Sequence, residues 1–276
     1  MRRVLTTALL LVLCVARSAA PQAIPLPLAI NGNQASATIA LPGGIGAELT
    51  LTFENSVGLN PSALDAWVSL VNPLDPALLS RLPASVQVPV LFPVLLRIGP
   101  SASSALSFSG VWTLVLHTHN LQLDPGLPLS LYSAEDGGAF RDIMGWEGTG
   151  SYRAGGSGGN FSEFLIVIDL QAVDVVITRK FAAVQALLND HQHTMPPAVA
   201  ATLQTRLAQA RTRYLLGDIS GAIAKMESFA SYTLAHSGQD IPDVWRANDP
   251  ELINVAGLLR SGAGTLIFSL RRKDNV

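Results

Sequence analysis

The sequence predicts an α+β protein, in which an N-terminal antiparallel β-sandwich precedes a small C-terminal helical bundle, all behind a cleavable signal peptide. Three observations support this prediction. The chain begins with a basic pair and an uncharged apolar run. Short segments that alternate apolar with polar residues, separated by Pro, Gly, Asn and Asp clusters, continue to about residue 177. Beyond that point apolar residues recur at steps of three and four, which is the helical period.

Residues 1–20 have the order of a secretory signal peptide. Arg2 and Arg3 form a positive start, residues 4–15 are apolar, and small residues follow, so that cleavage after Ser18 or after Ala20 is expected. The apolar run is shorter than the roughly 20 residues that a membrane-spanning helix needs. The alternative is a short buried core helix. The preferred interpretation implies an exported protein, periplasmic or extracellular.

The composition argues against several kinds of site in the mature chain. Its only cysteine, Cys14, lies inside the leader, so no disulfide, thiol nucleophile or thiolate metal site is expected after cleavage. Charged residues make up 14% of the sequence and form no dense basic patch, which argues against nucleic-acid binding. No apolar run in the mature chain is long enough for a transmembrane span.

The strand-like part is expected to cover residues 23–177. Turn clusters such as Pro42-Gly43-Gly44 separate its segments. Residues 114–116 and 164–168 are the most continuously apolar, so they are expected at the centres of the sheets. The predicted strands are Gln34–Leu41, Ala47–Phe53, Asp65–Val71, Val86–Ile98, Leu106–His119, Pro128–Ser133, Ser151–Ala154 and Phe161–Leu170.

The helical module is expected over residues 178–271, followed by a short basic tail, 272–276. Pro196 and Pro197 open its second helix, because proline is well tolerated at the first helical position. Gly217 ends that helix and Asp218 caps the next one. A fourth helix is expected to begin at Asn248 or Asp249. Trp245 is expected to fill the seam between helices before it.

Several segments resemble known families. The spacing of Leu203, Leu207, Gly217-Asp218 and Phe229 looks like the FIMAH-type helical module of secreted bacterial proteins. The whole chain is similar to a family of uncharacterised exported bacterial proteins, a domain of unknown function. The segments that carry this likeness are Phe53–Leu59, Leu116–Leu121, Phe161–Val167 and Ile241–Arg246. The Ser162–Phe164 segment also resembles the closing strand of Ig-like or ZU5-like sandwiches. The resemblance implies secretion and architecture but no catalytic residue.

Two His-x-His pairs are the candidate metal ligands. His117 and His119 lie two apart on a predicted strand, so both point to one face and can hold zinc or copper if a carboxylate or a third histidine joins them. His191 and His193 form a second pair, at a helix end. The alternative for each pair is a histidine bonded to backbone or water. No other cofactor is expected.

Two further patterns are weaker. Gly155–Gly159 matches the nucleophile elbow letter by letter, but strand follows it where the elbow needs a helix, so a flexible hairpin loop is expected. Acidic and aromatic residues between Glu135 and Tyr152 suggest a calcium or sugar contact loop, with a solvated acidic loop as the alternative. The members of that cluster are Glu135, Asp136, Asp142, Trp146, Glu147 and Tyr152.

These observations predict a secreted or periplasmic, non-enzymatic binding protein with an extracellular or envelope ligand. One alternative is a metal-binding protein or metal-dependent hydrolase centred on His117 and His119. Another is a structural component of the cell envelope.

Overall fold

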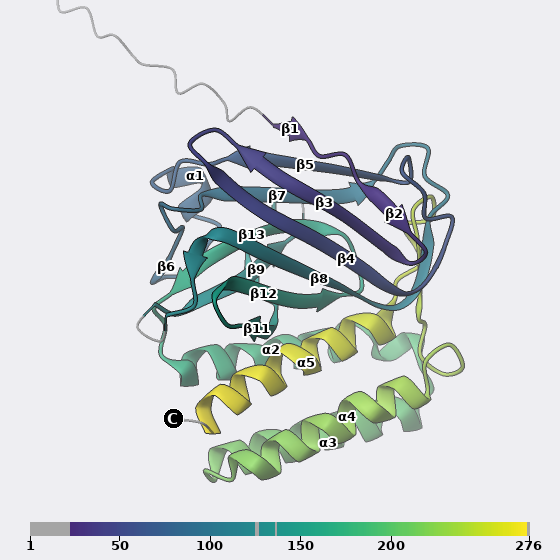
Figure 1. Cartoon of the computed structure of the whole chain (residues 1–276). Coiled ribbons are helices and arrows are strands. Elements are labelled where there is room, and N and C mark those ends of the chain that lie inside the picture. Colours follow the sequence, from purple (N-terminus) through teal and green to yellow (C-terminus); the bar gives the residue numbers. More distant parts are fainter. Residues whose placement is uncertain (1–22, 125–126, 136, 275–276) are drawn as a thin grey trace, which may run out of the picture.

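The computed structural model describes residues 23–124, 127–135 and 137–274. The predicted signal peptide, residues 1–20, lies outside the described residues. Two antiparallel sheets pack against each other, and a helical region follows them in the chain (Figure 1). The α+β organisation predicted from the sequence is therefore confirmed.

The first sheet, sheet A, has a hydrophobic central strand. In order across the sheet its path is β1 (Ile24–Pro25), β5 (Leu64–Leu70), β7 (Val94–Pro100), β13 (Ser162–Asp169), β9 (Leu129–Ala134) and β10 (Arg141–Asp142), while β6 (Val86–Gln87) also pairs with β13. Nearly all of β13 is buried, as the apolar run 164–168 predicts for a central strand. A four-residue helix, α1 (Pro76–Leu79), lies between β5 and β6.

The second sheet, sheet B, is built around the long strand β8. Its path is β11 (Met144–Gly148), β12 (Ser151–Gly158), β8 (Ser107–Gln122), β4 (Ile45–Val57), β3 (Gln34–Leu41) and β2 (Ala29–Asn31), while β14 (Val244–Arg246) pairs with the start of β8. The β3–β4 turn contains Gly43 and Gly44, both with positive φ (80° and 75°), as the predicted turn requires.

One hydrophobic core lies between the two sheets. Alternate residues of each strand point into it, such as Leu49 and Leu51 from sheet B and Val68 and Leu96 from sheet A. The opposite residues of β4 and β8 point outward. This alternation sets which side chains of sheet B are available to solvent.

The helices form a second core. They are α2 (Val173–His191), the 3₁₀ turn η1 (Gln192–Thr194), α3 (Pro197–Leu215), α4 (Ile219–Ala235) and α5 (Val255–Asp274). Figure 1 shows α2 and α5 next to the sheets and the α3–α4 pair on their far side. Asp218 caps α4 by accepting from the backbone N–H of Gly221, as predicted. No helix within the described residues combines the length and the apolarity that crossing a bilayer requires.

The segment before the last helix differs from the prediction. Helix α5 begins at Val255, not at Asn248 or Asp249, and it includes residues 272–274, which the sequence placed in a tail. Trp245 belongs to β14, where it stacks on Phe108 (5.3 Å between ring centroids) and packs edge-on against Phe161 (4.8 Å). It therefore completes the edge of the β core and does not fill a seam between helices.

The glycine run is also not the flexible loop that the sequence suggested. Residues up to Gly158 belong to β12, and most of that strand is buried. A Cβ on Gly158 would lie 2.2 Å from the Trp112 ring, and one on Gly159 would lie 2.8 Å from the backbone nitrogen of Leu258 in α5. These glycines let a tryptophan and a helix approach the strand closely.

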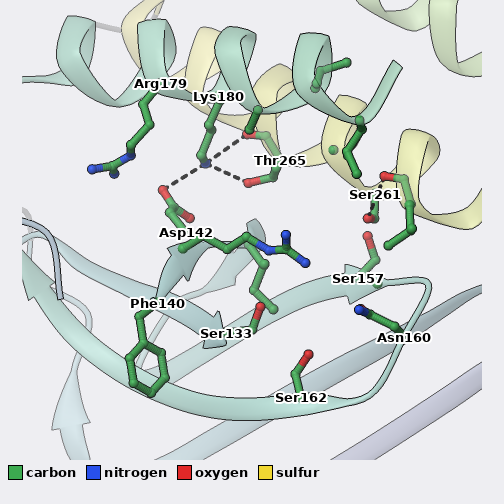
Figure 2. Close-up of a pocket in the computed structure, with 18 of the residues that line it drawn as sticks. Ser133, Phe140, Asp142, Ser157, Asn160, Ser162, Arg179, Lys180, Ser261 and Thr265 are labelled. Atoms are coloured by element: carbon green, nitrogen blue, oxygen red, sulfur yellow. Dashed lines mark hydrogen bonds and ion pairs between the residues drawn. The ribbon is translucent and has the colours of Figure 1, made fainter. Parts of the chain in front are cut away.

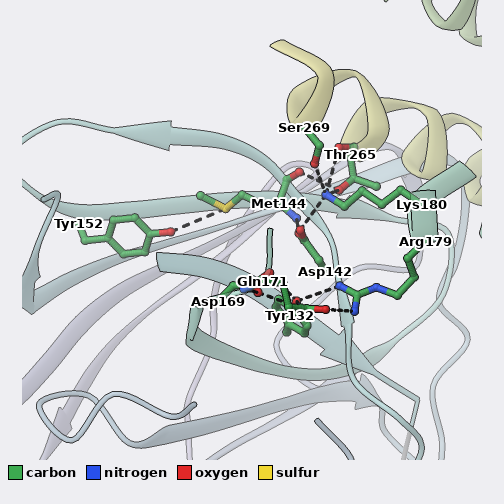
Figure 3. A network of polar contacts seen from close by, with 10 residues as sticks. All are labelled: Tyr132, Asp142, Met144, Tyr152, Asp169, Gln171, Arg179, Lys180, Thr265 and Ser269. Atoms are coloured by element: carbon green, nitrogen blue, oxygen red, sulfur yellow. Dashed lines mark hydrogen bonds and ion pairs between the residues drawn. The ribbon is translucent and has the colours of Figure 1, made fainter. Parts of the chain in front are cut away.

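A buried polar network fastens the helices to the sheets (Figure 3). The ammonium of Lys180 in α2 lies 2.8 Å from Asp142 Oδ2 and donates to the hydroxyls of Thr265 (2.6 Å) and Ser269 (2.8 Å) in α5. Asp142 also accepts from the backbone N–H of Met144 (2.7 Å). Burial lowers the pKa of Lys180, whereas the Asp142 charge opposes that shift. Lys180 therefore joins α2, α5 and the β10–β11 corner.

A second ion pair joins α5 to β4. Arg260 donates to both carboxylate oxygens of Glu54 (2.7 Å each), and Glu54 also accepts from the backbone N–H of Val111 (3.2 Å). The pKa of Glu54 lies below its usual 4.5, chiefly because of the Arg260 hydrogen bonds. Stability from this group is therefore present above pH 4.5 and is lost as the pH falls through the folded-state pKa.

Replacing Glu54 with glutamine is expected to lower stability at pH 7 by less than about 1 kcal/mol, because the pair is partly exposed. The difference from wild type should shrink as the pH falls below 4.5, because the wild-type carboxylate then becomes protonated. Urea unfolding at each pH measures this, with Glu251→Gln as a control on an exposed glutamate. A Glu54→Gln deficit that stays constant across the whole pH range would contradict the interpretation.

Candidate metal centre

Strand β8 presents His117 and His119 on the outer face of sheet B. Their neighbours Leu116 and Thr118 are buried, so the alternation of the strand turns both imidazoles outward. The ring centroids are 5.3 Å apart, with an angle of 80° between the ring planes. The shared face predicted from the sequence is therefore present.

Glu48 on the neighbouring strand β4 supplies a third ligand group. The register of the two strands sets Glu48 directly opposite His117. Its carboxylate oxygens lie 3.0 Å from His117 Nδ1 and 3.7 Å from His119 Nε2. Glu48 lies in a predicted alternating strand, but nothing local to that strand indicates that β4 pairs with β8, so the sequence alone does not identify Glu48 as a ligand.

A hydrogen bond on the far side of the His117 ring fixes its orientation. Nε2 of His117 lies 2.6 Å from the hydroxyl of Ser151 on β12. Without a metal, Nδ1–H can donate to Glu48 while Nε2 accepts from the Ser151 hydroxyl; with a metal on Nδ1, the proton would be on Nε2, which would donate to Ser151. Histidines that bind metals commonly donate their second N–H in this manner, which fixes both tautomer and orientation.

Gly46 makes room for the second imidazole. It lies opposite His119 across the strand pair, and a Cβ at position 46 would lie 3.1 Å from His119 Nδ1. Its backbone N–H donates to the side chain of Asn120 (2.8 Å), which in turn donates to the carbonyl of Gly44. The β3–β4 turn is thereby tied to β8 beside the cluster.

The charge of the cluster suits a cation. The pKa of the Glu48 carboxyl is below its usual value, first because of its hydrogen bond with His117 and further because both imidazoles and Arg153 attract its charge. Glu48 is therefore ionised at neutral pH. It is also exposed, so that an ion from solvent has direct access.

The three side chains each offer one ligand atom, and these atoms lie within 4.8 Å of one another. Ligands of a tetrahedral zinc ion are about 3.4 Å apart, as zinc–nitrogen distances of about 2.0–2.1 Å require. Small side-chain rotations would close this difference. Two imidazoles and a carboxylate suit zinc or copper(II), whereas calcium prefers six to eight oxygens.

The comparison with known families agrees with the likeness seen in the sequence. A family model described as a family of unknown function (DUF6689) matches residues 9–273. The chain belongs to this family. The DUF6689 match runs through both sheets and through the helices, so the family is defined over the two cores together. No curated protein matches the chain.

The second His-x-His pair of this DUF6689 chain lies elsewhere. His191 ends α2 and His193 lies in the 3₁₀ turn that follows. Among the residues that the structure describes, the only group of three or more potential metal ligands is Glu48, His117 and His119. No third ligand from the described residues therefore joins His191 and His193.

The suggested calcium or sugar loop does not assemble in the DUF6689 chain. Asp142 is buried against Lys180, and Glu135 accepts a hydrogen bond from Asn160 (2.9 Å). Tyr152 points inward and donates to the sulfur of Met144 (3.8 Å). Asp136 lies outside the described residues. Among the described members of the set, Asp142, Glu135 and Tyr152 thus have separate partners and do not converge on one loop.

Proposed function

We propose that this protein is an exported binding protein that holds one zinc or copper(II) ion at Glu48, His117 and His119. The observation that carries the proposal is the convergence of two imidazoles and one carboxylate from paired strands. The ligand groups stand on rigid sheet and not on loops, so the geometry is largely preformed. Three protein ligands leave a position for water or for a second molecule.

Export and architecture complete the proposal. The basic pair and apolar run of residues 1–20 support a cleaved leader, and with it a periplasmic or extracellular location. The two packed sheets support an Ig-like or ZU5-like sandwich, and α2 to α5 support a FIMAH-like module that braces it. The metal would then be presented to the exterior on the open face of sheet B.

Metal titration of the mature chain, residues 21–276 without a His-tag, tests the proposal. Isothermal titration calorimetry with zinc, copper(II) and calcium salts, together with elemental analysis, is expected to find one zinc or copper ion per chain. A His117→Ala, His119→Ala double variant should lose stoichiometric binding. Glu48→Gln should weaken it by at least about tenfold, because the site loses its anionic ligand.

A matched control removes two histidines elsewhere. The His191→Ala, His193→Ala variant should bind metal as the wild type does, since neither residue approaches the cluster. Wild-type protein that is folded but retains no stoichiometric zinc or copper would contradict the proposal. So would unchanged binding by the His117, His119 double variant. If the metal-loaded wild type hydrolysed an ester or peptide panel, the non-enzymatic part of the proposal would be wrong.

A further inference from the structure

A separate cavity lies between the sheets and the helices. Residues near β10, β12 and the start of β13 form one side, and α2 and α5 form the other (Figure 2). The cavity has a volume of about 130 Å3 and opens to solvent. It is therefore smaller than most small-molecule sites, about 300–1,000 Å3, and suits a small ligand that extends toward its mouth. The cavity shares no lining residue with the Glu48, His117, His119 cluster.

Serine hydroxyls line the sheet side of the cavity. Ser133, Ser157 and Ser162 all contribute, and Figure 2 shows them beneath the helices. Ser133 and Ser162 are buried, yet their hydroxyls bond to no other described residue and are not cut off from solvent. Burying a polar group without a partner costs free energy, so such hydroxyls are available to a ligand or to water in the cavity.

The charged side chains of the cavity differ in whether they are free to bind a ligand. All three hydrogens of the Lys180 ammonium are directed to Asp142, Thr265 and Ser269. The Arg179 guanidinium donates to the side chains of Gln171 (2.7 Å) and Tyr132 (3.2 Å). Within the described part of the chain, Arg141 has no hydrogen-bond or ion-pair partner, although it lines the same cavity.

The balance of charge in the lining is positive. Arginines 141 and 179 and Lys180 contribute three cations, whereas Asp142, which is paired with Lys180, contributes the one carboxylate among the lining residues. An anionic ligand is therefore favoured over a cationic one. A guanidinium binds carboxylates through paired, charge-assisted hydrogen bonds.

Part of the helix side of the cavity is apolar. Val184 and Leu187 of α2 and Leu258 of α5 line it, and Phe140 adds an aromatic ring from the sheet side. The cavity thus offers a cation, several hydroxyls and a hydrophobic wall together. This combination fits an amphipathic molecule better than an ion or a fully polar sugar.

We propose that this cavity binds a small organic monocarboxylate with an apolar body. The carboxylate pairs with Arg141 and accepts from the serine hydroxyls, while the apolar body lies against Val184, Leu187 and Leu258. This inference does not depend on metal binding at the outer face of sheet B.

Calorimetry with octanoate and phenylacetate, beside the neutral octanamide and phenylacetamide, tests the proposal on the full mature chain. The wild type should bind at least one of the acids with one-to-one stoichiometry, at least tenfold more tightly than its amide. Arg141→Met should weaken binding of the acid at least tenfold and leave the amide unchanged. Arg211→Met, a surface arginine on α3, controls for the loss of net charge.

A second variant tests the place of binding. Ala183 is exposed and lines the cavity, so Ala183→Phe should obstruct it without disturbing a core and should weaken binding of the acid at least tenfold. Ala186→Phe, also at an exposed position of α2 but outside the lining, should bind as the wild type does. Circular dichroism confirms that each variant is folded.

Three results would overturn the proposal: no binding of either acid by folded wild type, equal affinity for acid and amide, or unchanged binding by Arg141→Met and Ala183→Phe. Zinc titration of the same preparations reports on the metal proposal separately. If the protein fails to bind the acid, metal binding can still be measured, and if it fails to bind metal, acid binding can still be measured.

Discussion

Replacing Lys180 with methionine is expected to lower the free energy of unfolding by about 3–5 kcal/mol. The Lys180 and Asp142 side chains are 6% and 7% exposed, so the variant leaves a carboxylate without its cation in a site shielded from water. The hydroxyls of Thr265 and Ser269 also lose a common partner. Urea unfolding at pH 7, followed by far-UV circular dichroism, measures the change.

The double variant Lys180→Met, Asp142→Asn separates two effects: the loss of the ion pair, and the cost of a buried Asp142 carboxylate that has no cation beside it. Asparagine retains an oxygen for the backbone N–H of Met144 and carries no charge. The double variant should therefore recover much of the stability that the single variant loses. A single variant that loses less than about 1 kcal/mol, or a double variant no more stable than the single one, would contradict this account.

Substituting Gly257 with alanine is expected to lower stability by about 1–3 kcal/mol, because α5 can no longer approach the sheet so closely. The added Cβ would lie 2.5 Å from the carbonyl oxygen of Gly110 and equally close to the Asn254 side chain. Asn254 holds both neighbours, since it donates to Gly110 O (2.6 Å) and accepts from the Gly257 N–H (2.8 Å). Thermal and urea unfolding provide the measurement.

The same helix contains a matched control. A Cβ on Gly264 would meet no atom within 4 Å. Gly264→Ala should therefore leave stability unchanged or raise it by up to about 1 kcal/mol, since alanine favours helix more than glycine does. Equal effects of the two substitutions would show that the tight contact at Gly257 has no energetic importance.

The alternation of apolar and polar residues predicted much of the β structure. The predicted strand Gln34–Leu41 coincides with β3, and the apolar runs 114–116 and 164–168 lie in strands at the middle of their sheets. These signals are local, because they follow from which face of a strand is buried. The helix starts at Pro197 and Ile219 were likewise predicted, from proline and the Asp218 cap.

One error has a local cause, and the others arise where the outcome depends on a distant partner. The predicted strand Val86–Ile98 divides into β6 and β7 around Pro89 and Pro93, which have no N–H to donate to a sheet. The glycine-rich sequence at the end of β12 predicts a loop, because the close approach of Trp112 and α5 that requires glycine there cannot be seen in the sequence. Glu48 joined the histidines only through a strand pairing that links positions 69 residues apart. Nothing in the local pattern encodes these neighbours.

The contacts of α5 can form only late during synthesis of the chain. Arg260 follows Glu54 by 206 residues, so at about 5–20 residues per second a ribosome needs roughly 10–40 s to supply this partner. The long strands are complete only at Asp169, the end of β13, and α5 begins at Val255, so the surface on which the last helix docks stays uncovered while the residues between them are made. A chaperone or translocation factor that shields this surface would act within the same period.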